Sequence, residues 1–362
     1  MKSSYLCLFL GICLGLNAES AVNRPVVSIV GNAFHVDGQP TYKGRFWNGN
    51  KIEGLLLNAR LVQGIFDDEN PDTRPLFRYP DTGKWDPNRN TNEFVQAMAT
   101  WNAYGLNSFT LNMQGGSPTG YGNKKWKNSA FTETGDLKPA YLARLTRILN
   151  RAEELQMIVI LGYFYFGQDQ NLLDEKAVLN AVDQMTIWLL EQGYGNVLVE
   201  INNECDVTAY DHPILMPSRV HELIQRVKSK TSKGRRLLAS TSFKGRAIPL
   251  EKVVDVSDFI LIHGNGVNDP AYIKEMVDET TNLAAYRGQP IVFNEDDHYG
   301  YDNPMNNFKY AIESYASWGY FDFRRKNESD IKIGYQSVPV DWGVQHERKR
   351  AFFDYVKLIS GR

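Results

Sequence analysis

VLVEINNE, at residues 197–204, is an apolar run that passes directly into two amides and a carboxylate. PIVFNE, at residues 290–295, repeats this design later in the chain. Short apolar runs of this kind are typical of strands that are buried on both faces of a parallel sheet. In barrels of such strands, the polar residues at the carboxyl ends meet on one face. We therefore expect Glu204 and Glu295 to lie on separate strands and to face each other.

Six further apolar runs bring the number of predicted strands to eight: Thr41–Trp47, Leu106–Leu111, Ile158–Phe164, Leu237–Thr241, Phe259–Ile262 and Tyr320–Phe323. Between them, apolar residues recur at spacings of three and four, as at Leu142, Leu145 and Leu149, which is typical of amphipathic helices. Eight strands that alternate with helices predict an α/β fold, the (β/α)8 barrel. The segment Ile52–Ile65 is ambiguous, and we expect a helix there, inserted after the first strand.

The residues before the barrel predict a small β-hairpin. Val26–Val30 and Ala33–Val36 flank Gly31-Asn32, and Asp37-Gly38 gives a second tight-turn signal. No low-complexity linker divides the rest of the chain. Residues 21–362 are therefore expected to form a single domain.

The first 20 residues are typical of a secretory signal peptide. Lys2 precedes an apolar run from Tyr5 to Leu16, which ends at Asn17-Ala18. The run is too short for a membrane anchor, and Ile12 before Cys13 does not fit a lipoprotein signal. We expect a secreted or periplasmic protein. Removal of residues 1–20 would leave Cys205 as the only cysteine of the mature chain, without an intramolecular disulfide.

Charge and motifs exclude several classes of function. The net charge of −2 gives no basis for binding nucleic acid or, in the mature form, an anionic membrane. The sequence lacks the G-x-S-x-G element of serine esterases and the glycine motifs that bind phosphates or dinucleotides. We expect no cofactor. Two carboxylates that face each other are instead what glycoside hydrolysis needs, because one protonates the leaving oxygen while the other attacks the anomeric carbon.

At these motifs the sequence resembles the clan A glycoside hydrolases, and family 5 in particular. Glu200-Ile201-Asn202-Asn203-Glu204 is similar to the fourth-strand pattern of that family, and Pro290 to Glu295 to its seventh-strand pattern. The resemblance implies a retaining enzyme for β-linked poly- or oligosaccharides, in which Glu204 is the acid/base and Glu295 the nucleophile. It also implies that Asn203 binds the sugar 2-hydroxyl. In such a mechanism Glu204 starts protonated, so we expect a raised pKa for Glu204 and a lowered one for Glu295.

Weaker similarities extend the implied site. Gly105-Leu106-Asn107 resembles a second-strand signature, His263 stands near the H-x-Y motif, and Trp318 corresponds to the tryptophan under the sugar. We add Asn112, Gln114 and Tyr163 as candidate sugar ligands, because they lie at or near predicted strand ends. Trp126, Asp296, Asp297 and His298 are further candidates in the loops.

Four positions depart from the family 5 pattern. Thr110 stands where the family has an arginine that orients the nucleophile, and Tyr163 lies in a run without the usual histidine. Cys205 replaces the proline after the acid/base, and Asn265 replaces the tyrosine of H-x-Y. The resemblance therefore implies a relative outside family 5 proper, and the cellulase and mannanase specificities do not carry over.

The sequence leaves alternatives open for the function and for the site. A barrel that binds carbohydrate without hydrolysing it is the rival function, although such proteins usually lack one catalytic glutamate. The cluster at residues 295–298 could bind a metal, but it lacks the spaced histidines of catalytic zinc sites, so we expect none. Glu200 should point into the barrel and pair with Arg45 or Arg60. We expect a monomer with a carbohydrate substrate.

Overall fold

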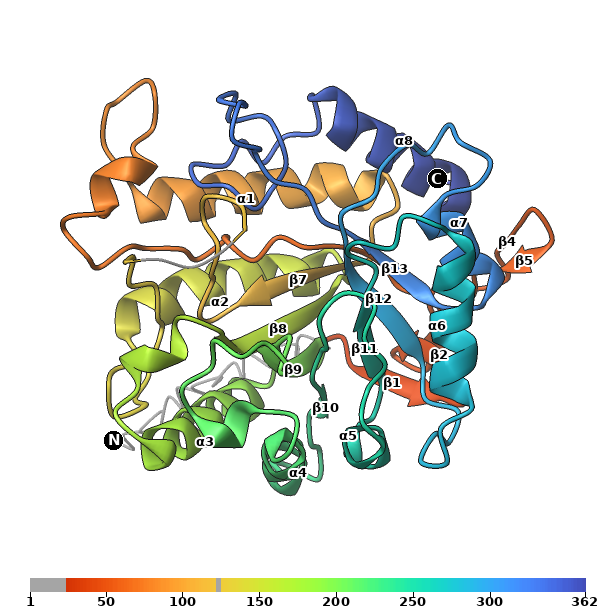
Figure 1. Cartoon of the computed structure of the whole chain (residues 1–362), viewed down its shortest axis with the longest axis horizontal. Helices are drawn as coiled ribbons and strands as arrows, with labels where there is room; N and C mark the ends of the chain where they lie inside the picture. Colours follow the sequence, from red (N-terminus) through yellow and green to blue (C-terminus); the bar gives the residue numbers. More distant parts are fainter. Residues whose placement is uncertain (1–23, 122–124) are drawn as a thin grey trace, which may run out of the picture.

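A computed structural model describes residues 24–121 and 125–362, so the predicted signal peptide lies outside the described residues. Within these ranges, eight parallel strands surround a central core (Figure 1). They are β6 (Leu57–Ala59), β7 (Ser108–Asn112), β8 (Ile158–Tyr165), β9 (Val197–Asn203), β10 (Leu238–Ser240), β11 (Ile260–His263), β12 (Ile291–Asp296) and β13 (Ser317–Tyr320).

The strands form two four-stranded sheets, ordered β10-β9-β8-β7 and β11-β12-β13-β6. The sheets meet where Arg60, just after β6, bridges Thr110 on β7. At the other seam the Asp258 amide donates to the Ala239 carbonyl, 3.0 Å away. The predicted (β/α)8 barrel is confirmed.

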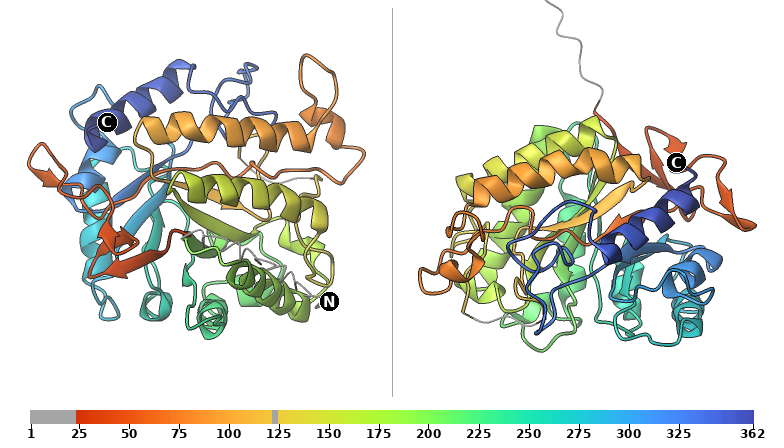
Figure 2. Two further views of the ribbon diagram at one scale, coloured as in Figure 1. Left: turned by 180° about the vertical axis from the view of Figure 1, so that it is seen from behind. Right: turned by 90° about the horizontal axis from the view of Figure 1, so that it is seen from above.

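Helices surround the strands, and three short 3-10 turns lie in the loops (Figure 2). The helices are α1 (Pro87–Ala103), α2 (Pro139–Glu154), α3 (Glu175–Gln192), α4 (Val220–Ser229), α5 (Glu251–Val256), α6 (Ala271–Thr281), α7 (Asn307–Glu313) and α8 (Glu347–Ser360), and the turns are Arg74–Phe77, Asp169–Asn171 and Pro213–Leu215. No helix among the described residues is both long enough and apolar enough to cross a bilayer.

The first and last barrel strands differ from the prediction. Thr41–Trp47 is not a barrel strand; its end, β4 (Phe46–Trp47), pairs with β5 (Asn50–Lys51) around Asn48-Gly49, a tight-turn signal that the prediction overlooked. The true first strand, β6, lies inside Ile52–Ile65, where we expected a helix. The last strand begins three residues before the predicted Tyr320.

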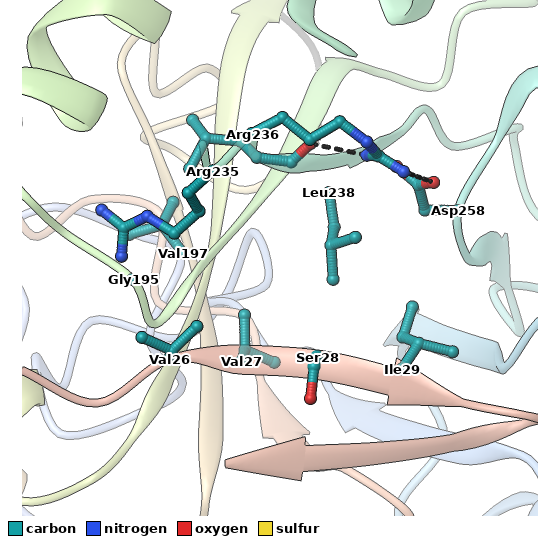
Figure 3. Close-up of a pocket in the computed structure, with 11 residues that line it drawn as sticks. Val26, Val27, Ser28, Ile29, Gly195, Val197, Arg235, Arg236, Leu238 and Asp258 are labelled. Carbon is teal, nitrogen blue, oxygen red and sulfur yellow. Dashed lines mark hydrogen bonds and ion pairs between the residues drawn. The ribbon is translucent and has the colours of Figure 1, made fainter. Parts of the chain in front are cut away.

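The predicted hairpin is confirmed and closes the amino-terminal end of the barrel. Antiparallel β1 (Val27–Val30) and β2 (Ala33–Val36) continue into β3 (Gln39–Pro40). Val27 and Phe34 pack against barrel residues that form one buried cluster: Leu56, Ile158, Ile160, Leu198, Phe259, Leu261 and Val292. Figure 3 shows residues of β1 facing Leu238 across a pocket, which Val197 also lines. The volume of this cavity is about 380 Å³.

Phe34→Ala is expected to lower the free energy of unfolding by about 3–5 kcal/mol, because it removes a fully buried aromatic ring from this cluster. Denaturant unfolding measures the loss. Val30→Ala is the control, since Val30 lies on the same hairpin but is 60% exposed. Equal losses in the two variants would contradict a sealing role for Phe34.

Candidate active site

The two glutamates meet at the carboxyl ends of β9 and β12. One oxygen of Glu204, one of Glu295 and a ring nitrogen of His263 all lie within 4.8 Å of one another. The side chains of Glu204 and Glu295 are 15% and 5% exposed, so both carboxylates are largely shielded but Glu204 is reachable from solvent. Glu204 and Glu295, which are 91 positions apart in sequence, are thus brought together at the carboxyl ends of parallel strands, as the strand-end pattern predicted.

His263, the last residue of β11, lies between the two carboxylates. Its Nδ1 is 3.0 Å from Glu204 Oε1 and 3.7 Å from Glu295 Oε2, and its side chain is fully buried. Burial lowers the pKa of His263, but the charge of Glu295 and the hydrogen bond to Glu204 outweigh this and raise the pKa above its ordinary value. A protonated His263 therefore fits between the two acids.

Two further residues hold Glu295. Arg60 Nε lies 2.8 Å from Glu295 Oε2, and both side chains are almost completely buried. Asn265 Nδ2 donates to Glu295 Oε1 at 2.7 Å. Because one oxygen faces a cation and the other accepts an amide hydrogen, the carboxylate has a fixed orientation.

The pKa values of the pair differ from our expectation. Burial raises the pKa of Glu295, against the opposing charges of Arg60 and His263. Burial alone would also raise the pKa of Glu204. The hydrogen bond from His263 and the positive charges of His263 and Arg60 outweigh burial and lower this pKa below its ordinary value. The sequence-based expectation was the reverse, because it did not include a histidine within hydrogen-bond distance of the acid. In the free protein His263, not Glu204, is therefore the preferred place for the proton.

Comparisons with known proteins agree with this architecture. No protein-family model matches the sequence, and no curated protein matches it either. Among solved structures, an endo-1,4-β-mannanase from Rhizomucor miehei superimposes with a TM-score of 0.58 at 10% identity, over 93% of this chain and 99% of that one. A family 5 mannosidase from the same organism gives 0.57 at 13% identity, over 92% and 97%. A broad-specificity endoglucanase from an uncultured bovine rumen ciliate gives 0.55 at 11%, over 84% and 95%.

The chain has the fold of the family 5 glycoside hydrolases. With this fold, two departures from the family 5 pattern have a counterpart in the structure. Thr110 replaces the family arginine, but Arg60 reaches Glu295 from the neighbouring strand, directly beside Thr110 in the sheet. Asn265 replaces the family tyrosine and hydrogen-bonds the same carboxylate.

A third departure from the family 5 pattern, Cys205, affects the backbone of Glu204. Glu204 has a left-handed conformation with φ of 50°. Its amide donates to Ser242 Oγ, and the Cys205 amide donates to the Ser242 carbonyl, both at 2.9 Å. A proline at position 205 could not donate this second bond and would restrict the residue before it. The Cys205 thiol is buried, which raises its pKa, so it is not a reactive thiolate.

Cys205→Pro is expected to reduce activity by about 10²-fold or more, because it displaces Glu204 from its left-handed backbone conformation. Cys205→Ala keeps the amide and should retain most of the activity. Steady-state kinetics on the two variants, with circular dichroism to confirm folding, makes the comparison. Full activity in a folded Cys205→Pro variant would refute this account of position 205.

Several buried polar atoms at this end of the barrel have no hydrogen-bond partner within the described residues. They include Asn112 Oδ1 and Nδ2, Asn203 Oδ1, Asn265 Oδ1, His263 Nε2 and Arg60 Nη1 and Nη2. Buried polar groups are normally paired, so groups of this kind at a site fit a polar ligand that would bond to them. Gly162 makes room for one of them, since a Cβ there would lie 2.4 Å from Asn112 Oδ1.

Three predicted sugar ligands lie elsewhere. Trp318 is on β13 itself, fully buried, with its ring stacked on Phe308 at 4.5 Å, so it has no free face for a sugar. The resemblance to family 5 misplaced it, because it is the second residue of β13 and lies away from the carboxyl end of the strand. Tyr163 is buried and its hydroxyl contacts Thr186 on α3, outside the strand wall. Both polar ends of the Gln114 side chain already have hydrogen-bond partners. Its Nε2 donates to Ser129 Oγ and the Gln168 carbonyl, and its Oε1 accepts from the amide of Tyr165 at the end of β8.

Asp296 and His298 also have structural contacts. Asp296 Oδ2 accepts hydrogen bonds from Trp318 Nε1 and Asn307 Nδ2, and its Oδ1 from the amide and Nδ1 of His298. Asp297 Oδ2 accepts a hydrogen bond from the hydroxyl of Tyr121. Trp126, another candidate from the loops, is only 4% exposed and therefore offers little surface to a sugar. The carboxylate of Asp296 therefore anchors the loop after β12.

Among residues 24–121 and 125–362, two groups could offer three ligand atoms to a metal ion, namely Glu204 with His263 and Glu295, and Asp296 with Asp297 and His298. In the first group Arg60 already places a positive charge on Glu295. In the second, both oxygens of Asp296 accept hydrogen bonds. These contacts favour proton chemistry over metal binding.

Glu200 is buried inside the barrel, as expected, but its partner is different. Asn294 Nδ2 donates to Glu200 Oε1 at 3.4 Å, whereas Arg60 pairs with Glu295. Arg45 donates to the carbonyls of Leu358 and Ile359. The prediction of an ion pair between Glu200 and either arginine was wrong.

Sequence reasoning missed the roles of Arg60 and Tyr165 at the site. The guanidinium carbon of Arg60 lies 6.0 Å from the centre of the Tyr165 ring, and the Tyr165 hydroxyl is 2.9 Å from Ser117 Oγ. The Tyr163-Phe164-Tyr165 run was a usable signal, because its last residue ends β8 at the mouth. The position of Arg60 had no such signal, since the strand before it was not recognised.

Proposed function

We propose that this protein is a retaining β-glycosidase of poly- or oligosaccharides, with Glu295 as nucleophile and Glu204 as acid/base. The observation that carries the proposal is the spacing of the two carboxylates, whose nearest ligand oxygens lie within 4.8 Å. Retaining enzymes place their carboxyl groups about 5–5.5 Å apart, whereas inverting enzymes need about 6.5–9.5 Å to admit a water. The arrangement thus supports double displacement.

The contacts of each glutamate support the division of roles. Glu295 is oriented by Arg60 and Asn265, as a nucleophile must be before attack. Glu204 is the more exposed of the two and lies 3.0 Å from the His263 ring nitrogen. In the first step Glu204 protonates the leaving oxygen as Glu295 forms the glycosyl ester. In the second, Glu204 removes a proton from the water that cleaves this ester.

His263 and the unpaired amides complete the proposed mechanism. His263 holds a proton next to Glu204 Oε1 and can supply it when a sugar oxygen approaches. Asn203, next to Glu204 in the chain, and Asn112 have buried polar atoms free to bond sugar hydroxyls. The substrate is bound at this mouth, and residues 1–20 direct the chain to export. We further propose that the protein acts as a monomer.

The pH dependence of stability tests the state of His263. Its pKa in the folded protein is raised above 6.5, so the stability that it contributes is fully present below pH 6.5 and is lost as the pH rises through the raised value. We expect the difference in unfolding free energy between wild type and His263→Asn to be larger at pH 6 than at pH 9. Urea unfolding at both values measures it; an equal difference at the two values would mean that folding leaves the pKa of His263 unshifted, and a smaller difference at pH 6 would mean that folding lowers this pKa.

A screen with aryl glycosides tests the proposed function. Purified wild type is assayed on nitrophenyl β-mannoside, β-glucoside and β-cellobioside and on soluble mannans and glucans, with Glu295→Gln as the matched inactive variant. Hydrolysis by wild type alone, with the first product a β-anomer by NMR, supports the proposal. Sugar binding without hydrolysis would instead favour the rival, a carbohydrate-binding barrel.

A further inference from the structure

Among the described residues, the side chains that contact the carboxylates of Glu204 and Glu295 are His263, Arg60 and Asn265, which offer hydrogen-bonding groups but no exposed aromatic face. A pyranose has an apolar C–H face besides its hydroxyls, and aromatic rings are the side chains that cover such a face best. Trp318, the residue expected to do so, is buried in the barrel wall and stacked on Phe308. Tyr165 is also buried. Neither of these two rings therefore offers a face to a sugar at the mouth.

We propose that Tyr121, in the loop between β7 and α2, forms the aromatic surface on which a sugar ring of the substrate stacks beside Glu295. The proposal rests on the proposed function, since it names a binding residue of the same site. Tyr121 is 56% exposed, yet its hydroxyl is hydrogen-bonded and its ring packs against other aromatic rings. This combination distinguishes it from an ordinary surface tyrosine.

Hydrogen bonds connect the Tyr121 hydroxyl to the nucleophile. The hydroxyl donates to Asp297 Oδ2 at 2.9 Å and accepts from Asn265 Nδ2 at 3.2 Å. The same Asn265 nitrogen donates to Glu295 Oε1 at 2.7 Å. Since both bonds share one atom, the sum of 3.2 and 2.7 Å, 5.9 Å, is the upper limit for the distance from the hydroxyl to Glu295. The hydroxyl end of the Tyr121 side chain thus lies close to the reacting carboxylate.

The Tyr121 ring also contacts two phenylalanines that follow β13. Tyr121 meets Phe323 at 4.7 Å and Phe321 at 5.7 Å between ring centres, at interplanar angles of 68° and 63°. Gly120 allows this approach, because its φ is +113° and a Cβ there would lie 2.9 Å from the Phe323 ring. A ring that is fixed in orientation before binding loses little entropy when a ligand stacks on it.

Binding to an inactive parent tests the proposal. Isothermal titration with cello- and manno-oligosaccharides is performed on Glu295→Gln, and on the same parent carrying Tyr121→Ala or Tyr121→Phe. We expect Tyr121→Ala to weaken binding by about threefold to tenfold, as for the loss of one aromatic contact. Tyr121→Phe keeps the ring and should bind nearly as the parent does. Phe46→Ala is the matched control, because Phe46 is 57% exposed but lies on the β4–β5 hairpin.

The outcomes separate this proposal from the proposed function. Unchanged binding in Tyr121→Ala, or equal losses in Tyr121→Ala and Tyr121→Phe, would overturn the stacking role even in an active glycosidase. A loss confined to Tyr121→Ala supports it, and does so even if wild type hydrolyses nothing, in which case only the proposed function fails. A parent that binds none of these sugars overturns the stacking proposal, whereas the aryl glycoside assay still decides hydrolysis.

Discussion

Glu295→Ala is expected to lower kcat by about 10⁴-fold or more, because it removes the group that attacks the anomeric carbon. Azide should restore part of the activity by entering the space that the carboxylate leaves. Because azide then attacks a β-glycoside from the opposite face, the product should be the α-glycosyl azide. NMR of the product measures the anomer, and thermal unfolding checks that the variant is folded.

Glu204→Ala is the matched comparison. This variant should still form the glycosyl ester from dinitrophenyl glycosides, whose leaving group needs no proton. Azide should then attack the ester and give the β-glycosyl azide. If the two variants give the opposite anomers, the roles of Glu204 and Glu295 are exchanged. If neither loses activity, the reaction takes place elsewhere.

Arg60→Met is expected to reduce both activity and stability. Without Arg60, the buried Glu295 loses its paired cation, so its pKa rises further and a smaller fraction of the nucleophile is ionised. We expect kcat to fall by about 10²–10³-fold and the free energy of unfolding by about 3–5 kcal/mol. Steady-state kinetics and urea unfolding give the two quantities.

The double variant Arg60→Met with Glu295→Gln distinguishes the ion pair from packing. Removing both charges leaves no unpaired buried charge, so the double variant should regain most of the stability that Arg60→Met loses. It should be inactive, because it lacks the nucleophile. Arg60→Lys is a second comparison, since lysine keeps the charge but lacks the planar nitrogen that faces Glu295. If the double variant is as unstable as Arg60→Met, the arginine acts through packing and not through its charge.

The parts of the site that the sequence predicted share one property. Glu204, Glu295 and His263 each follow a recognisable apolar strand, so the parallel register alone brings them to one mouth. Seven of the eight barrel strands and the hairpin followed from the same patterns, whereas the first barrel strand did not. Assigning Glu204 and Glu295 their separate roles needed the resemblance to family 5 in addition.

The parts that were missed depend on short strands and on distances. β6 has only three residues, Leu57–Ala59, which is too few for a periodic pattern, so Arg60 was not placed at a strand end. Trp318 is the second residue of β13 and its ring stacks on Phe308 in the barrel wall, a placement that the resemblance to family 5 did not reveal. The pKa order of the two glutamates depends on the 3.0 Å contact with His263, and no spacing in the sequence encodes that distance.

The amino-terminal hairpin has a consequence for how the chain folds. It is the first described structure to be synthesised, yet the residues that receive Val27 and Phe34 extend along the chain to Val292. Val27 also donates its amide to the carbonyl of Gly195. Contacts between segments so distant in sequence form slowly, because a long loop must close first. The hairpin can therefore cover the amino-terminal end of the barrel only when most of the chain has been synthesised. Until then the apolar residues at that end remain exposed to solvent and accessible to chaperones.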